Sequence, residues 1–409
     1  NPTIAINILV SLGKNFWNKI KKIKSNTDAI ISIAESNIVK KILLKIIKWL
    51  QKKIKKISHN IDDIINDSEI DVVVEVMGGI EPAFTFVKKA LEAGKSVCTS
   101  NKALVAAHGP ELLAMAKERK LNFMFEASVG GGIPIIRPLN QSLTADEIIN
   151  ITGILNGTTN YILTKMSNEG MDYDVVLKEA QELGYAERNP EADVEGFDAC
   201  RKIAILTSLA YGSTVHFEEI YTEGISHITT QDFKYAQKLG YVVKLLATSY
   251  KKDGKVYAMT APFMIESSHP LYNVNDVLNG IYVNGNVLGN VMFFGAGAGK
   301  LPTASAVVSD VVDCVKHKGT NVMTVWSNKE LELGNTQDEV RSFFVRVKGS
   351  LDDLTKIKEN FGNVKTVTVE DIEDEFGFGT QDMTEKEFTE AAKNIPMISR
   401  IRIDKTVFS

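Results

Sequence analysis

The chain has few cysteines, no long apolar run and no excess of basic charge, and each absence excludes a class of protein. Its three cysteines, Cys98, Cys200 and Cys314, lack the spacing of a metal site or a disulfide framework, so we expect small buried side chains in a reducing compartment. The chain has no run of eighteen apolar residues, so no membrane span is predicted. A net charge of −4 argues against a nucleic-acid partner. We therefore expect a cytoplasmic protein that binds neither membrane nor nucleic acid.

Length and composition point to a globular protein of several domains. The chain has 409 residues, of which 44% are apolar and 24% charged, and this length favours two or three domains. The six histidines show no metal-ligand spacing and are interpreted as structural.

Residues 1–65 differ in composition from the rest. They are rich in isoleucine, lysine and asparagine and contain a single glycine, Gly13. Lysines alternate with apolar residues over 40–57, a pattern typical of a basic amphipathic helix. Such a helix binds either a membrane surface or a protein core, and we favour the core.

The order of the expected elements predicts an α/β fold with three parts. Strands and helices alternate over residues 71–126, which indicates a Rossmann-type, doubly wound parallel sheet. A helix at 302–316 is expected to return to it, which gives a first domain of 1–147 and 300–327. A middle α+β domain, 148–299, mixes helices with strand-like runs. The last domain, 338–409, has the β-α-β-β-α-β order of a ferredoxin-like fold, and we expect catalysis to remain possible after removal of residues from about 335 onward.

The stretch from Gly184 to Lys202 is the most informative in the chain. Its acidic residues surround a proline loop that leads into a helix; they are Glu187, Glu191, Asp193, Glu195 and Asp198, with Glu182 just before the stretch. Asp198 and Lys202 are four residues apart and share a helix face, just before an apolar run. They are either an ordinary surface ion pair or a buried lysine that donates a proton.

Six sequence blocks in register change the balance between these two alternatives. They read EVMGG from Glu75, TSNKALVAAHG from Thr99, EASVGGGIPII from Glu126, GILNGTTNYIL from Gly153, GYAERNPEADVEGFDACRK from Gly184 and GAGAGKLPTASAVVSD from Gly295. In this order over residues 70–325 the chain resembles the homoserine dehydrogenases. That family reduces L-aspartate 4-semialdehyde to L-homoserine with NADH or NADPH, in threonine and methionine biosynthesis.

The resemblance implies roles for residues of the acidic stretch. Lys202 would act as the proton donor, and Asp198 would orient Lys202 or hold the substrate. Glu187, together with Asp198, would bind the substrate ammonium, and Gly184 would contact the cofactor. Glu191, Asp193 and Glu195 are expected to cap and solvate the loop. The middle domain would then bind substrate and form the dimer interface.

The resemblance also implies an NADP or NAD site, formed by Gly13, Gly78, Asn101, Lys102 and Gly299. A G-x-G-x-x-G turn lets the backbone approach a pyrophosphate, but the aligned residues Ile8 to Gly13 keep only the last glycine. Three explanations stay open: an unusual turn, an impaired site, or a misassigned sequence over residues 1–65, which the change of composition favours. Glu35, at the end of the expected second strand, favours NADH.

Further ligands are implied by the same resemblance. Glu126 with the carbonyl groups of Val129, Gly131 and Ile133 would hold a sodium ion, although a capped turn without an ion fits the chemistry equally well. The C-terminal domain resembles an ACT domain, for which threonine is the expected effector, and a homodimer or homotetramer is expected.

Two alternative functions remain open. One is a catalytically weakened, amino-acid-sensing homologue, suggested by the altered glycine motif together with the ACT-like C-terminal domain. The other is a different NAD(P)-dependent amino-acid dehydrogenase on the same scaffold, since a fold alone does not fix a function.

Overall fold

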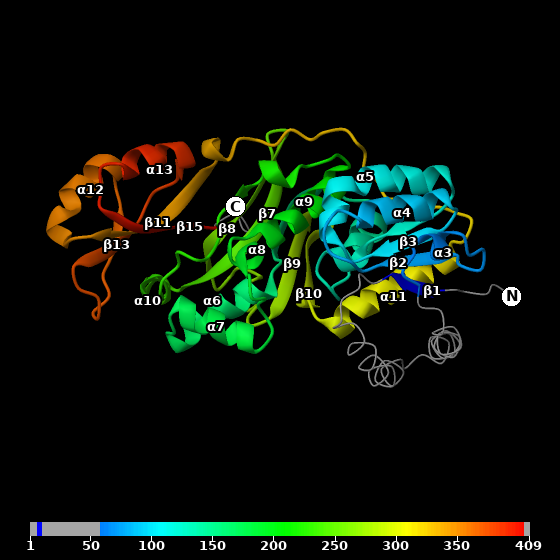
Figure 1. Cartoon of the computed structure of the whole chain (residues 1–409). Helices are drawn as coiled ribbons and strands as arrows, with labels where there is room; N and C mark the ends of the chain where they lie inside the picture. The colour runs from blue at the N-terminus through cyan, green and yellow to red at the C-terminus, as the bar shows by residue number, and fades with distance from the viewer. Residues whose placement is uncertain (1–5, 10–57, 405–409) are drawn as a thin grey trace. The chain divides into compact units, whose positions relative to one another are not determined.

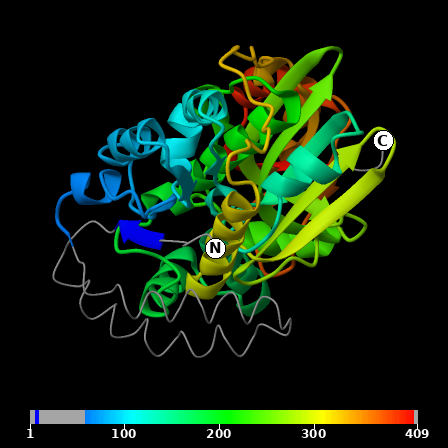
Figure 2. The same ribbon diagram turned by 90° about the vertical axis from the view of Figure 1, so that its right-hand side faces the viewer.

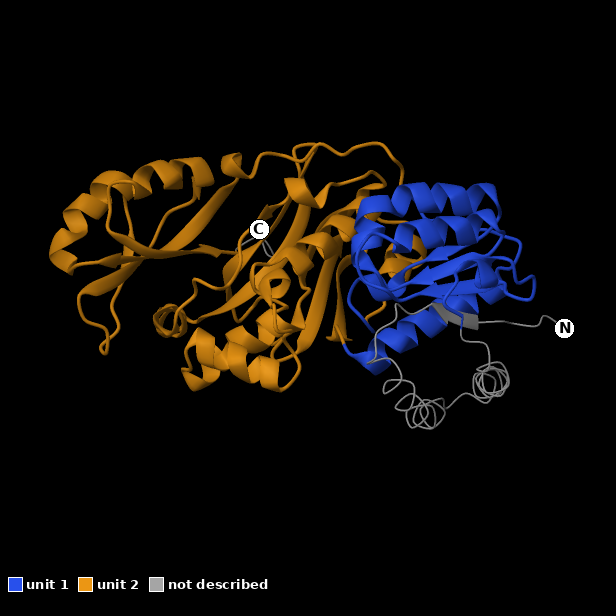
Figure 3. Ribbon diagram, viewed as in Figure 1, with its two compact units in different colours: residues 1–132, 299–325 blue, residues 133–298, 326–409 orange. Residues whose placement is uncertain are grey.

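The computed structural model describes residues 6–9 and 58–404 and divides into two compact units (Figure 3). Unit 1 comprises residues 1–132 and 299–325, and unit 2 comprises residues 133–298 and 326–409. The expected helix at 40–57 and the candidate residues Gly13 and Glu35 lie outside the described residues.

Unit 1 is built on a parallel four-stranded sheet in the order β1-β2-β3-β4. The strands are β1 (Ile6–Leu9), β2 (Val72–Glu75), β3 (Ser96–Thr99) and β4 (Phe123–Met124). The helices are α3 (Asp62–Ile65), α4 (Ala83–Glu92), α5 (Lys102–Glu118), α11 (Lys300–Lys316) and the short 3-10 helix η1 (Glu126–Ser128). Every residue of β2 and β3 is buried, as expected for parallel strands covered on both faces. The predicted Rossmann-like alternation is confirmed.

Helix α11 belongs to unit 1 although it follows the middle domain in sequence. Val311 and Cys314 of α11 share a core cluster with Val72, Val74 and Cys98 of the sheet. The thiols of Cys98 and Cys314 lie 3.6 Å apart. The predicted return of the chain to the first sheet is therefore confirmed.

Unit 2 contains a mixed sheet whose main path runs β10-β9-β5-β7-β8-β15-β11-β13-β12 (Figures 1 and 2). Its first part consists of β5 (Ile148–Ile154), β6 (Tyr221–Thr222), β7 (Tyr241–Lys252), β8 (Lys255–Glu266), β9 (Leu278–Gly285) and β10 (Gly289–Ala296). The accompanying helices are α6 (Gly157–Glu169), α7 (Tyr173–Glu182), α8 (Glu191–Val194), α9 (Phe197–Tyr211) and α10 (Thr230–Leu239), with the short helices η2 (Pro138–Ser142) and η3 (Phe217–Glu219). This mixture of helices and strands agrees with the α+β character expected of the middle part of the chain.

The C-terminal part of unit 2 follows the predicted β-α-β-β-α-β order. It consists of η4 (Thr336–Asp338), β11 (Val340–Lys348), η5 (Leu351–Asp353), α12 (Leu354–Phe361), β12 (Lys365–Val367), β13 (Glu375–Gly379), β14 (Met383–Thr384), α13 (Glu385–Ala392) and β15 (Met397–Ile403). We call residues 340–403 the C-terminal module. Its strand β15 pairs in parallel with β8, Arg402 beside Phe263 and Ile403 beside Met264, so both parts share one sheet.

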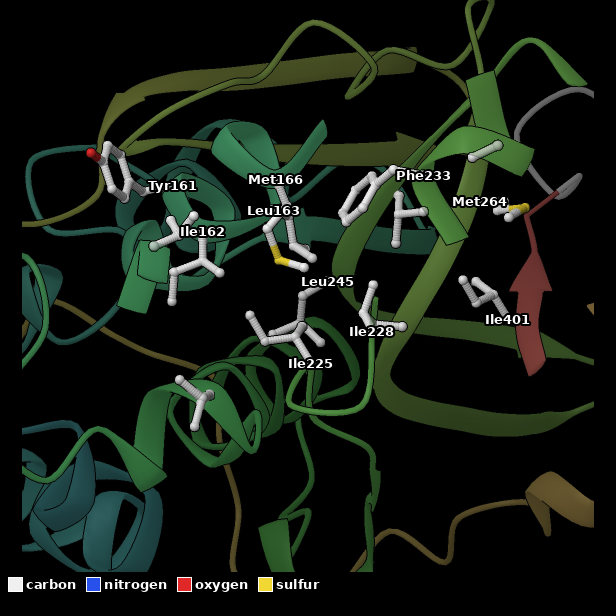
Figure 4. Packing of buried hydrophobic residues seen from close by; sticks show 14 of the residues in the cluster. Tyr161, Ile162, Leu163, Met166, Ile225, Ile228, Phe233, Leu245, Met264 and Ile401 are labelled. Carbon is white, nitrogen blue, oxygen red and sulfur yellow. The ribbon is translucent and has the colours of Figure 1, made fainter. Parts of the chain in front are cut away.

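The core of unit 2 also crosses from the middle part into the C-terminal module. One buried cluster contains Ile162 and Met166 of α6, Phe233 of α10, Met264 of β8 and Ile401 of β15 (Figure 4). The C-terminal module is therefore packed into unit 2 by apolar side chains as well as by strand pairing.

Within residues 6–9 and 58–404, none of the helices has the length and apolar content of a membrane-spanning segment. Cys98, Cys200 and Cys314 are buried free thiols, as expected.

Candidate functional site

Helix α9 begins after Gly196, a position at which the backbone conformation and the neighbouring side chains require glycine. Gly196, the residue before α9, has φ of +81°, a conformation that other residues rarely adopt. A Cβ atom at Gly196 would also lie 3.2 Å from the methyl groups of Thr222 and Thr260. The turn therefore fixes the direction in which the acidic loop enters α9 and places Asp198 in its first turn.

Asp198 and Lys202 form the buried pair that the spacing suggested. Lys202 Nζ donates to Asp198 Oδ2 at 2.6 Å and to the backbone carbonyl of Leu155 at 2.7 Å. The two side chains are only 11% and 6% exposed, which excludes the ordinary surface ion pair. An ion pair held out of water by two defined acceptors has a fixed geometry, as a proton donor requires.

Two further side chains, Asn156 and Asp193, join this pair. Asn156 Nδ2 donates to Asp198 Oδ2 at 2.9 Å and to Asp193 Oδ1 at 2.7 Å. From the sequence we expected Asp193 only to cap and solvate its loop, and Asn156 was not singled out. The N-G-T sequence before a helix was a usable signal for a cap at Asn156, but the contact between β5, α8 and α9 is a tertiary one.

Glu187 and Gly184 lie on the loop between α7 and α8. Both are exposed, and Gly184 has φ of +76° with open space where a Cβ would stand. Thr158 of α6 donates to the carbonyl of Tyr185 at 2.6 Å, which ties this loop to the turn that carries Asn156. Among the described residues, no ion pair joins Glu187 to Lys202, whose anionic partner is Asp198.

The candidate cofactor residues of unit 1 gather at the carboxyl ends of β2 and β3. Asn101 Nδ2 donates to the carbonyl of Gly79 at 2.6 Å, and its Oδ1 accepts from the Leu104 amide and caps α5. Glu75 accepts from Thr99 Oγ1 and from the Met77 amide, both at 2.5 Å. Burial raises the pKa of Glu75 despite these hydrogen bonds. The two loops are therefore tied together where ligands approach a parallel sheet.

The glycines near this edge have different reasons for their presence. A Cβ at Gly78 would meet nothing within 4 Å, and Gly299, just before α11, has φ of +110°. Lys102 is half-buried in the first turn of α5. Gly297, by contrast, admits no Cβ because the side chain of Asn279 occupies that space. Close contact at Gly297 is thus with the protein itself.

The candidate cation ligands follow β4 in sequence. Glu126 is 3% exposed, and its backbone amide donates to Asp310 Oδ2 at 2.9 Å. Val129 is buried, and Gly130 and Gly131 have φ of +72° and +57°. No group of three or more His, Cys, Asp or Glu side chains arranged for a metal occurs among residues 6–9 and 58–404, so a cation here would depend on one carboxylate and backbone carbonyls.

Family models match most of the chain. Residues 11–126 match the model described as "Homoserine dehydrogenase, NAD binding domain", and residues 134–312 match the model described as "Homoserine dehydrogenase". The C-terminal module lies beyond both matches.

Curated relatives are homoserine dehydrogenases. The chain is 50% identical over 246 residues to that of Synechocystis sp., which covers 59% of this chain and 57% of the relative. It is 42% identical over 293 residues to that of Bacillus subtilis, covering 70% and 68%. The alignment thus spans less than two thirds of the Synechocystis protein.

Solved structures give the same family over a longer span. A homoserine dehydrogenase from Thiobacillus denitrificans superposes with a TM-score of 0.81 at 30% identity, covering 99% of both chains. A hyperthermophilic archaeal homoserine dehydrogenase in complex with NADPH gives 0.56 at 33% identity, covering 64% of this chain and 76% of that one. The chain belongs to the homoserine dehydrogenase family.

Proposed function

We propose that the protein is an NAD(P)-dependent homoserine dehydrogenase that interconverts L-aspartate 4-semialdehyde and L-homoserine. The observation that carries this proposal is the Lys202 ammonium, buried and held by Asp198 and the Leu155 carbonyl in a chain of this family. The oxygen of an aldehyde becomes negative during its reduction, and a positioned cation that also delivers a proton stabilises it.

Lys202 has one N–H left for that oxygen. An ammonium carries three N–H donors, and two of them are directed by Asp198 and Leu155. No other described residue accepts from Lys202. The third N–H supports protonation of the alkoxide by Lys202 in reduction, and the neutral amine would take the proton back in homoserine oxidation.

The substrate ammonium needs an anionic partner. Glu187 and Asp198 are proposed for this role from the family resemblance. The exposed carboxylate of Glu187 on the loop beside Gly184 supports it, since an exposed side chain can turn to a ligand. Asp198 is already engaged with Lys202, so it would act mainly by orienting that lysine.

A nicotinamide dinucleotide fits the residues of unit 1. When bound, NAD(P)H supplies the hydride. Gly78 leaves open space at the carboxyl end of β2, and Asn101, Lys102 and Gly299 lie at the starts of α5 and α11, where backbone N–H groups favour phosphate. We assign these residues of unit 1, with Gly13, to cofactor binding, and Gly184 of unit 2 stays a cofactor contact that the family resemblance implies.

A sodium ion is proposed at Glu126 and the carbonyls of Val129, Gly131 and Ile133. A buried carboxylate followed by a tight glycine turn supports this choice, because such a turn can direct carbonyl oxygens inward. Dependence of activity on sodium over potassium chloride at constant ionic strength would test it.

An ACT-type regulatory role is proposed for the C-terminal module, with threonine as the effector. Its four main strands are ordered β15-β11-β13-β12, the arrangement of a ferredoxin-like fold. The turn after β11 is rigid, because Ser350 and Asp353 form a reciprocal cap next to Gly349. If millimolar threonine leaves the activity of the intact protein unchanged, threonine is not its effector.

A homodimer or homotetramer is proposed through the free edge of the sheet. Strand β10 is the terminal strand of the main path, and its Phe294 is 55% exposed. Val287 and Leu288, in the turn that precedes β10, are 81% and 53% exposed. Sedimentation velocity of the intact protein would measure the oligomeric state.

The activity is tested by homoserine-dependent reduction of NAD⁺ and NADP⁺, followed by absorbance. Turnover with L-homoserine, and none with other small hydroxy amino acids, supports the proposal. Cofactor binding without turnover would instead favour a sensing homologue, and turnover of another amino acid would favour a different dehydrogenase.

A further inference from the structure

The side-chain amide of Asn156 has a single orientation that its surroundings determine. Its Oδ1 accepts from the backbone amide of Thr159 at 2.8 Å and from Thr159 Oγ1 at 3.0 Å. Only the carbonyl oxygen can accept a backbone N–H, so Nδ2 must face the other way. There its two hydrogens meet two carboxylates, Asp193 and Asp198. All three side chains lie in unit 2, and Asn156 is 5% exposed.

The amide therefore holds two like charges beside each other. One nitrogen within 2.9 Å of both carboxylates brings them close in a poorly solvated region, where their repulsion is weakly screened. Donation from a shared N–H₂ group offsets that repulsion and fixes the direction of each carboxylate. The acceptor on Asp198 is Oδ2, the same oxygen that accepts from Lys202.

The main chain at Asn156 contributes to the same arrangement. The preceding residue, Leu155, provides the carbonyl that accepts from Lys202 Nζ. Leu155 and Asn156, the two residues that directly follow β5, thus contact Lys202 and its partner Asp198. Because Asn156 caps α6, its backbone is fixed by the start of that helix.

We propose that Asn156 is a positioning residue for the reaction: it orients Asp198, and through Asp198 it aims the Lys202 ammonium at the substrate oxygen. This inference rests on the proposed function and adds a residue that acts only through others. Helix capping alone does not explain asparagine here, since serine and aspartate cap comparably well. Asparagine alone combines the cap acceptor with two donors for carboxylates at this length.

Two variants keep the cap and remove the bridge. Asn156→Ser retains an acceptor for the Thr159 amide but has no second donor for Asp193 and Asp198. Asn156→Asp retains the cap and places a third carboxylate against the other two. The matched control is Asn335→Ser, since Asn335 caps the short helix η4, where its side chain accepts from the Gln337 amide.

We expect kcat for homoserine oxidation to fall roughly tenfold to hundredfold in Asn156→Ser, because displacement of a reacting group lowers the rate by about this factor. The fall in kcat should be larger in Asn156→Asp. The KM for the nicotinamide cofactor should stay within about twofold. Asn156 acts through Asp198 on Lys202 and contributes no binding energy toward the cofactor itself. The deuterium isotope effect on kcat, measured with homoserine deuterated at the carbinol carbon, should increase. Asn335→Ser should match the wild-type protein in all three measurements.

Wild-type kcat and isotope effect in a folded Asn156→Ser variant would overturn the proposal. A crystal structure of Asn156→Asp reads the positioning directly and does not depend on turnover. The proposal expects the Lys202 Nζ to Asp198 Oδ2 distance to exceed 4 Å, and an intact pair would refute it. If the wild-type protein does not oxidise homoserine, the proposed function fails, while the crystal structure still decides whether Asn156 positions the pair.

Discussion

Arg402 of β15 donates to Glu223 at 2.6 Å and, through Nε, to Glu385 at 2.5 Å. Arg402 is only 1% exposed, and its guanidinium lies 4.8 Å from the centre of the Tyr221 ring. Glu223 belongs to the middle part of unit 2, and Arg402 and Glu385 belong to the C-terminal module. A desolvated ion pair thus joins the two parts.

Glu223 also lies next to the start of α9. Gly224 packs so closely on Val194 and Glu195 that it admits no Cβ, and the Ile225 amide donates to the Val194 carbonyl at 2.8 Å. The chain segment that Arg402 holds is therefore the one that packs against the turn into α9, the helix of Asp198 and Lys202.

The first prediction is that Arg402→Met destabilises the protein by about 3 kcal/mol, because its removal leaves the buried carboxylates of Glu223 and Glu385 to share the single guanidinium of Arg400. Burial opposes ionisation, but the hydrogen bond from His227 and the charges of Arg402 and Arg400 hold the pKa of Glu223 well below its usual range. Glu223 is therefore charged at neutral pH, and its stabilising effect is lost only as the pH falls below the ordinary value of 4.5. Urea unfolding at pH 7 measures the change.

The control for Arg402 is Lys393→Met, which removes an exposed ion pair with Glu390. Exposed pairs contribute little, so its unfolding midpoint should barely move. Equal midpoints for Arg402→Met and the wild-type protein would show that the junction is not stabilising.

The second prediction corrects the expectation that residues from about 335 onward can be removed. Truncation after residue 334 would remove the strand that pairs with Phe263 and Met264 of β8. It would also remove the two donors to Asp232 Oδ1, which are Arg346 at 2.9 Å and Ser399 at 2.6 Å. We expect the truncated chain to be insoluble or to unfold without cooperativity, as seen by circular dichroism. A truncated chain with native-like unfolding and activity would contradict this.

The third prediction uses steady-state kinetics to distinguish the proposed role of Lys202 as proton donor from the proposed role of Glu187 in binding the substrate ammonium. Lys202→Ala should lower kcat by roughly a hundredfold or more while the fold persists, since general-acid catalysis typically contributes this much. Glu187→Gln should instead act mainly on the KM for homoserine, because it removes a partner of the ammonium. Steady-state assays of both variants decide the matter: normal turnover in Lys202→Ala, or an unchanged KM in Glu187→Gln, would exclude the assigned role.

The fourth prediction concerns the pH dependence of stability. Lys244 Nζ is buried and donates to the Val274 carbonyl at 2.6 Å and to Asn275 Oδ1 at 2.9 Å, and burial lowers the pKa of Lys244 to about 8. The unfolded chain binds the proton more tightly, with an ordinary value of 10.5, so stability from this group rises as the pH increases from 8 to 10.5.

Lys244→Met should lack this rise. We expect the difference in unfolding free energy between the wild-type protein and Lys244→Met to grow by about 3 kcal/mol over that interval, since one pKa unit corresponds to about 1.4 kcal/mol. Urea titrations at several pH values measure it, and groups that titrate in both proteins cancel. A difference independent of pH would mean that Lys244 stays charged in the folded state.

The fifth prediction concerns cofactor choice. A carboxylate at Glu35 would accept from a ribose 2′-hydroxyl and repel a 2′-phosphate, so NADH should bind more tightly than NADPH. Fluorescence titration of both reduced cofactors measures this. Tighter NADPH binding would refute the Glu35 argument, and no binding of either would show that Ile8 and Val10 block the phosphate site.

The sequence by itself determined the parallel nucleotide sheet, the order of elements in the C-terminal module and the pairing of Asp198 with Lys202. These follow from local rules: the alternation of strands and helices, the period of the helix and glycines at defined turns. Sequence blocks in register also sufficed to predict the family, because they preserve residue identity as well as pattern.

Only the tertiary structure decided what surrounds those residues. Asn156 and Asp193 join the Lys202 site from different elements, and Arg402 meets Glu223 across 179 positions of sequence. No local period encodes such contacts, since they depend on which strand ends meet after the sheet has formed. For the same reason the β-α-β-β-α-β order of residues 338–409 suggested a separable domain, whereas strand pairing and a shared core make the C-terminal module part of unit 2.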